Sequence, residues 1–188
     1  MDGSLAGKLL IAMPGIGDPR FEKAVIMMCV HTEEHAMGLV VNKPREELRL
    51  GDVLDHLGIQ AGAKLAPRQV LDGGPVRPDR GYVLHSEDFK SGDATQPIAP
   101  GICLTATREV LEAMAGEAAP QRFMLALGCS GWGAGQLEDE MKQNAWLVVD
   151  AAADDAIIFG GDHTGKWGDA IKRLGFDPGQ IAGETGRA

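Results

Sequence analysis

Three short apolar segments near the N-terminus follow one another with no helical pattern between them. They cover residues 7–13, 24–31 and 36–42, and only the polar residues 32–35 separate the second from the third. Antiparallel strands can be joined by so short a connection, whereas parallel strands need a crossover of about a dozen residues or more. The spacing therefore predicts a β-hairpin over residues 24–42 and disfavours a doubly wound parallel sheet.

The rest of the chain mixes further strands with amphipathic stretches, without strict alternation. Strands are predicted at residues 69–72, 81–85, 102–105, 122–127 and 145–149, and helices at 50–57, 107–114, 136–143 and 165–174. Residues 92–100 and 128–135 are predicted as loops, and 155–159 as a short strand or helical turn. This pattern favours an α+β fold, a mixed β-sheet with hairpins and three to four helices packed on it. The 188 residues fit a single domain over 1–188, since one domain takes roughly 150 residues.

The charge balance argues against a nucleic-acid partner. The chain has 27 acidic and 18 basic residues, a net charge of −9, and no run of Lys or Arg. Nucleic-acid binding depends on clustered cations that neutralise phosphates, and the nearest approach to a cluster is Arg68, Arg77 and Arg80. We therefore expect a protein or small-molecule partner and no direct contact with nucleic acid.

Cysteine usage and the length of the apolar runs indicate a cytoplasmic protein. Cys29, Cys103 and Cys129 are odd in number, lie far apart and form no CxxC pair, which is typical of reduced, buried thiols. The longest apolar run covers only residues 24–30, while a membrane helix needs about 20 residues. We expect no export signal, no membrane segment and no cofactor.

Four segments carry a resemblance to a known family. They are residues 7–14 with 18–21, His31 with 38–44, residues 73–76 with 81–85, and residues 131–138 with 144–147. In this order and at these spacings they resemble the YqgE/AlgH family along nearly the whole chain, and Trp167 and Ala170 extend the likeness. Each motif alone is weakly specific, whereas four in register are very specific.

The resemblance implies a small bacterial α+β protein whose family has no assigned biochemical function. The family carries the label of transcriptional regulator, because one member was linked to the control of alginate. It supplies no catalytic residue, cofactor or DNA sequence that could be carried over. This chain has Cys129-Ser130 where many relatives have an aromatic residue before the Gly-Trp segment, so the resemblance implies no role for such a ring here.

The Gly-rich segment 128–135 allows two interpretations. Backbone N–H groups where a strand meets a helix can hold an anion, but Glu138, Asp139 and Glu140 follow closely and would repel one. The segment also lacks the ending of a P-loop. The other interpretation, which we favour, is that the glycines allow a tight turn and close packing beneath Trp132.

The same segment approaches a nucleophile elbow. The pattern G-x-S-x-G is matched at residues 128–131, but Trp132 stands where the last glycine is required. Cys129 or Ser130 would need a base, for which the candidates are His31, His85 and His163. We assign no catalytic residue.

His31 and His35 have the spacing of a zinc-binding pair on a helix. They flank a predicted turn instead, and no third ligand is evident in the sequence. We therefore assign no metal site and expect His31 to end a strand.

The remaining candidates are loops at strand ends, which can meet when strands share a sheet. The predicted ligand cleft consists of His31, Asn42, Pro44, Gly74, Trp132, Gly135 and Gln136. The amides of Asn42 and Gln136 both donate and accept hydrogen bonds, which suits a neutral or weakly polar ligand better than a polyphosphate beside Glu138. The alternative is that each loop serves its own turn and the loops never meet.

Two functions remain open at this point. The first is a non-enzymatic regulatory module that binds a protein or a small ligand, because a catalytic signature is missing and the family is labelled as regulatory. The second is a small-molecule-binding enzyme or sensor that uses the Gly-Trp loop, His31 and Asn42. Convergence of these loops on one concave pocket would favour the second.

We predict that Trp132 is buried or lines a pocket wall, because it stands between two glycines before a helix. Trp132→Ala should then lower the free energy of unfolding by roughly 3–5 kcal/mol. Urea denaturation of both proteins measures this difference, and an unchanged midpoint would contradict it.

We also predict that this chain alone binds no specific duplex DNA at physiological salt. Specific binders reach about 10⁻⁸–10⁻¹¹ M, and dispersed cations on a chain of net charge −9 do not supply that affinity. Mobility-shift titrations test this prediction. A salt-sensitive, sequence-selective shift near nanomolar protein would refute it.

Overall fold

The computed structural model describes residues 3–152 and 156–182, which contain ten strands and six α-helices. The strands are β1 Lys8–Ala12, β2 Val25–His31, β3 His35–Val40, β4 Pro44–Arg49, β5 Gln69–Asp72, β6 Val76–Ser86, β7 Thr95–Ala99, β8 Ile102–Thr105, β9 Phe123–Gly133 and β10 Trp146–Asp150. The helices are α1 Leu50–His56, α2 Arg108–Met114, α3 Gln136–Lys142, α4 Ala156–Phe159, α5 Lys166–Arg173 and α6 Pro178–Ala182, with 3-10 turns η1 Pro19–Phe21 and η2 Gly92–Ala94. No helix in these ranges is both long and apolar enough to cross a membrane.

The strands form one mixed sheet in the order β10-β1-β2-β3-β9-β6-β8-β7, with β4 and β5 off this path. The predicted hairpin is confirmed, because β2 and β3 pair antiparallel from Ile26 opposite Val40 to His31 opposite Ala36. Among the described strands, β5 and β9 make the one parallel pair. The structure is therefore α+β with a mixed sheet, as the sequence predicts.

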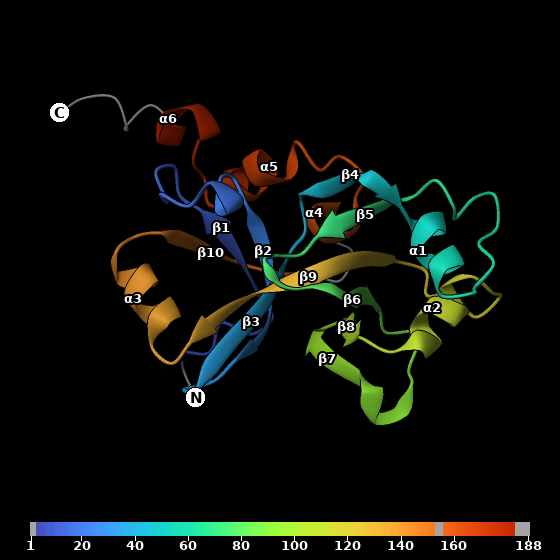
Figure 1. Ribbon diagram of the computed structural model, residues 1–188. Coiled ribbons are helices and arrows are strands. Elements are labelled where there is room, and N and C mark those ends of the chain that lie inside the picture. Colours follow the sequence, from blue (N-terminus) through green and yellow to red (C-terminus); the bar gives the residue numbers. More distant parts are fainter. Residues whose placement is uncertain (1–2, 153–155, 183–188) are drawn as a thin grey trace.

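The sheet is strongly curled (Figure 1), and its concave side holds the largest core. Leu9 of β1 and Leu104 of β8 lie far apart in the strand order yet belong to one buried cluster. Helices α4 and α5 add Ile158, Trp167 and Ile171 to this cluster, so they close the open side of the curl.

Two smaller cores lie outside the curl. The helices that pack on them, α3 for one and α1 and α2 for the other, lie at opposite ends of the molecule in Figure 1. At one end α3 packs Leu137 against Trp132 and Trp146. Trp132 is 5% exposed, so its predicted burial is confirmed. At the other end α1 and α2 pack on β6 and β9, with Leu54 and Val110 buried between them.

Several predicted boundaries are wrong, because tertiary pairing overrides local signals. The predicted loop 92–100 contains β7, an edge strand that tolerates Pro97 because an edge N–H is dispensable. The predicted loop 128–135 is largely strand, since β9 continues to Gly133 and pairs with β3. Strand β4 was not predicted at all. The prediction of three to four helices is too low because α4 and α6, of 4 and 5 residues, are too short to show periodicity.

The connection from β5 to β6 crosses β9 with backbone lying directly on backbone. A Cβ atom on Gly74 would overlap the backbone of Cys129, and a Cβ on Gly128 would overlap the carbonyl oxygen of Gly74. Gly128 also has φ +76°, a conformation that disfavours any side chain. Glycine is therefore required on both sides of this crossing.

We predict that Gly128→Ala lowers the free energy of unfolding by about 3 kcal/mol or more, because steric overlap and backbone strain add. Gly133→Ala is the matched control, since a Cβ there meets nothing within 4 Å and its φ is not positive. Thermal denaturation of both variants measures the difference. Equal melting temperatures would refute this account of the crossing.

Candidate functional site

The Gly-Trp segment serves to anchor α3 rather than to form an open loop. The indole N–H groups of Trp132 and Trp146 both donate to Oε2 of Glu140, at 2.9 and 2.8 Å. Gln136 donates to Oε1 of Glu140 at 3.2 Å and accepts from the backbone N–H of Gly133 at 3.1 Å. One carboxylate and one amide thus bind two strands to the first turns of α3. This bonding supports the packing interpretation of the glycines over the anion-binding one.

His31 connects the N-terminal segment with α3. Its Nδ1 accepts from the backbone N–H of Leu5 at 2.9 Å, so Nε2 carries the proton and donates to Oε1 of Glu138 at 2.7 Å. The backbone N–H of Glu138 and this His31 bond hold the pKa of the Glu138 carboxyl below its usual value. The partner of the His35 ring is Thr32, at 3.3 Å. Across residues 3–152 and 156–182 no three or more His, Cys, Asp and Glu side chains form a metal-binding group.

Asn42 secures the turn that leads into β2. Its Oδ1 accepts from the backbone N–H of Val25 at 2.9 Å, and its Nδ2 donates to the carbonyl of Lys23 at 2.7 Å. Lys23 has φ +53°, so the Asn42 amide supports a conformation that non-glycine residues rarely adopt. Both ends of the amide are therefore occupied within the protein.

The seven residues of the predicted cleft fall into two groups at opposite ends of β3. One end of β3 pairs His35 with Gly133, which brings His31, Trp132, Gly135 and Gln136 to that end. The other end leads to Asn42, Pro44 and Gly74, because Val40 donates to the carbonyl of Gly73 at 3.0 Å. At about 3.3 Å per residue, the groups lie roughly 20 Å apart. The structure does not bring Asn42 and Gln136 together, and a ligand at either group remains a prediction.

The possible nucleophiles are buried, and no hydrogen bond between one of them and a histidine is found among the described residues. Ser130 is fully buried and donates its hydroxyl to the carbonyl of Gly73 at 3.2 Å. Burial raises the pKa of the Cys29 thiol to about 12, with the nearby Cys129 adding to the shift. His85 is bonded to the Ser86 carbonyl and to the Thr105 hydroxyl, at 2.7 and 2.8 Å. The arrangement shows no nucleophile–base pair at Cys129 or Ser130.

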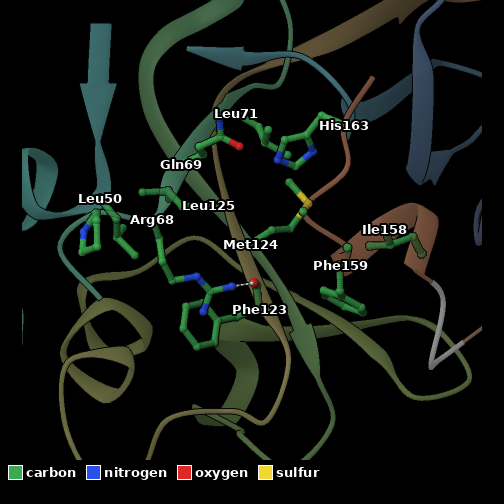
Figure 2. A pocket seen from close by; sticks show the side chains of 13 residues that line it. Leu50, Arg68, Gln69, Leu71, Phe123, Met124, Leu125, Ile158, Phe159 and His163 are labelled. Atoms are coloured by element: carbon green, nitrogen blue, oxygen red, sulfur yellow. Dashed lines mark hydrogen bonds between the residues drawn. The ribbon is translucent and has the colours of Figure 1, made fainter. Parts of the chain in front are cut away.

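A different site, which the sequence reasoning missed, lies where the starts of β5 and β9 meet the α4–α5 connection (Figure 2). It is a pocket of about 300 Å³ with Arg68, Gln69 and His163 on its rim and Leu71, Met124 and Phe159 among its apolar walls.

Arg68 is fixed against the wall of this pocket. Its guanidinium carbon lies 4.2 Å from the centre of the Phe123 ring, and its Nη2 donates to the Phe123 carbonyl at 3.2 Å. Partial burial lowers the pKa of Arg68. None of the five ion pairs within the described part of the chain includes Arg68, so no carboxylate there neutralises its charge.

His163 also lines this pocket. Its Nδ1 is buried and has no hydrogen-bond partner among the described residues. Burial, and secondly the charge of Lys166, lower the pKa of His163, while the Val41 carbonyl and Asp162 act in the opposite direction. The imidazole is therefore neutral at neutral pH. Lys166 itself is buried and donates to the carbonyl of Val41 at 2.8 Å.

No local sequence signal identifies this pocket. Arg68, Phe123 and His163 stand in three segments separated by 54 and 39 intervening residues. None belongs to the motifs that carry the family resemblance. The pairing of β5 with β9 and the packing of α4 under the sheet bring these residues together.

Comparison with known proteins places the chain in a family. A family model described as AlgH-like matches residues 9–179. A UPF0301 protein of Caulobacter vibrioides is 47% identical over 185 residues, covering 98% of this chain and 94% of that protein. A UPF0301 protein of Paracoccus denitrificans is also 47% identical, over 187 residues, with 98% and 97% covered.

The chain is also similar to solved structures, among them the following two. The solution structure of the AlgH protein from Pseudomonas aeruginosa superposes with a TM-score of 0.80 at 35% identity, covering 100% of this chain and 98% of that one. A crystal structure of a Corynebacterium diphtheriae protein has a TM-score of 0.72 at 18% identity, covering 96% and 91%, and shows the shared fold alone. With the family model and the 47% identical relatives, these similarities show that the chain belongs to the AlgH-like family, whose biochemical function is not assigned.

Proposed function

We propose that this chain is a non-enzymatic regulatory module that binds a small ligand with one anionic group in the Arg68–His163 pocket. The observation that carries the proposal is that His163 and Arg68, whose guanidinium forms no ion pair with a described carboxylate, line the same pocket. A carboxylate or phosphate on Arg68 would gain charge-assisted bonds.

The lining limits the class of ligand. Among the described residues that line the pocket, Arg68 is the one permanent cation, so a single anionic group is favoured over a polyphosphate. The walls of Leu71, Met124 and Phe159 suit an apolar body. A volume of about 300 Å³ lies at the small end of ligand pockets. We infer a compact carboxylic acid with a hydrophobic part.

The regulatory and non-enzymatic parts of the proposal rest on what surrounds the pocket. The nucleophile candidates Cys129 and Ser130 are buried in β9 and are not among the residues that line the pocket. A ligand between β9 and the α4–α5 connection would stabilise their contact, because binding to the native state alone stabilises it by mass action. Three free, buried thiols support the cytoplasm as the place of action.

The alternative, an enzyme or sensor at the Gly-Trp segment, His31 and Asn42, has less support from the geometry. The side chains of His31, Asn42 and Gln136 already have partners within the protein. They also lie at two ends of β3, so they offer no common pocket for a substrate.

We predict that small carboxylic acids with an apolar body raise the melting temperature of the wild type. The Arg68→Gln variant should bind these acids at least about tenfold more weakly, because a hydrogen bond to a charged group contributes about 1.5–3 kcal/mol. Thermal-shift screening followed by calorimetric titration measures both effects. Lys64→Gln is the matched control, since it removes one exposed charge from the same connection.

His163→Leu should also weaken binding, and NMR spectra of the ligand should be unchanged after prolonged incubation with the protein. Equal affinity of wild type and Arg68→Gln, or no carboxylate that stabilises the wild type, would overturn the ligand site. Chemical conversion of the bound ligand would overturn the non-enzymatic role.

A further inference from the structure

The first part of β6 protrudes from the sheet as a bulge. Val76 pairs with Cys129 of β9 and the next pair is Gly81 with Leu127, so residues 77–80 of β6 stand opposite Gly128 alone. Residues 76–80, which we call the β6 bulge, are all exposed. Val76 is 43% exposed, one of the few large hydrophobic side chains at the surface of the described residues.

The β6 bulge is held in place rather than loose. Pro78 packs over Gly128, where a Cβ atom would lie 3.3 Å from the Cα of Pro78. Nη2 of Arg45 in β4 donates to the carbonyl of Pro78 at 3.2 Å. Arg77 has φ +48°, a conformation that non-glycine residues avoid and that surrounding structure must maintain. The tertiary structure thus fixes a strained arginine at the surface.

Three arginines gather at this bulge without acidic partners. The guanidinium carbon of Arg80 lies 5.6 Å from the centre of the Tyr82 ring. Burial raises the pKa of Tyr82, and the positive charges of Arg80 and Arg77 act in the opposite direction. Arg45, Arg77 and Arg80 belong to none of the five ion pairs found in the described ranges.

This cluster of cations lies on a chain whose overall net charge is −9. Asp79 is the one acidic residue within the β6 bulge. Arginine is enriched at protein interfaces and lysine is depleted there, because the planar guanidinium binds carboxylates in a bidentate way. All three cations here are arginines, and the exposed Val76 beside them offers an apolar contact.

We propose that Arg45 and the β6 bulge form a docking surface for an acidic segment of a partner protein. Charge complementarity supports this occupant. Arginines that form no ion pair attract carboxylates, and on an otherwise acidic protein they direct an acidic segment to this one surface. Nucleic acid fits less well, because three cations neutralise few phosphates and the acidic remainder repels a long polyanion. Addition of a β-strand is disfavoured, because Pro78 has no N–H to donate. The surface is distinct from the Arg68–His163 pocket and does not depend on it.

The test uses a short fluorescein-labelled peptide in which Glu residues alternate with occasional Leu residues. Fluorescence anisotropy at physiological salt measures the binding of this peptide to the full chain. We expect saturable binding by the wild type. Arg77→Gly should bind at least about tenfold more weakly, as expected for loss of an interface arginine. Because glycine accepts a positive φ, this variant should keep or raise the melting temperature, which separates loss of docking from loss of folding.

Controls distinguish the site and the class of partner. Lys142→Gln removes a charge from exposed α3 and should leave peptide affinity unchanged, while Arg80→Ser should weaken it as Arg77→Gly does. A peptide with Gln in place of Glu should not bind. No binding of the acidic peptide by the wild type, or equal binding by Arg77→Gly, would overturn the proposal. Tighter, Arg77-dependent binding of an oligothymidine of equal charge would also overturn it in favour of nucleic acid.

Discussion

The fold depends on one close backbone contact, where the β5–β6 connection crosses β9. Gly73 donates its N–H to Leu127 at 2.9 Å and accepts from the N–H of Val40 at 3.0 Å, so one residue joins β3 and β9 at the end of β5. Gly74 and Gly128 then pass each other with no space for a side chain. Because of this contact, one edge of β9 pairs first with β5 and, further along the strand, with β3. The other edge of β9 pairs with β6.

Both proposed functional features follow from this central strand. The start of β9 supplies Phe123 and Met124 to the pocket, and its parallel pairing with β5 brings Arg68 beside them. Further along, Gly128 leaves room for the chain to bulge outward at Pro78. The ligand pocket and the arginine-rich surface therefore depend on two different short stretches of β9, which allows both to occur on one acidic chain.

The motifs that identify the family turn out to hold the structure together. Asn42, His31 and Gln136 have side chains that could bind a ligand, and each instead bonds to backbone or side-chain atoms of this protein. Asn42 bonds to Val25, which is 17 residues away in the sequence, and His31 bonds to Glu138, which is 107 residues away. A single sequence shows which atoms can form hydrogen bonds, but the tertiary structure decides whether those atoms are already satisfied.

The sequence by itself determined the features that depend on local periodicity and turn chemistry. These are the β2–β3 hairpin, α1, α2, α3 and α5, the α+β class and the family. Only the tertiary structure decided the extension of β9 through Gly133, the edge strand β7, and the position of Arg68 and His163 on one pocket. The physical reason is that strand pairing and pocket formation join residues far apart in the chain, and their hydrogen bonds and burial leave no periodic trace in the segments that they connect.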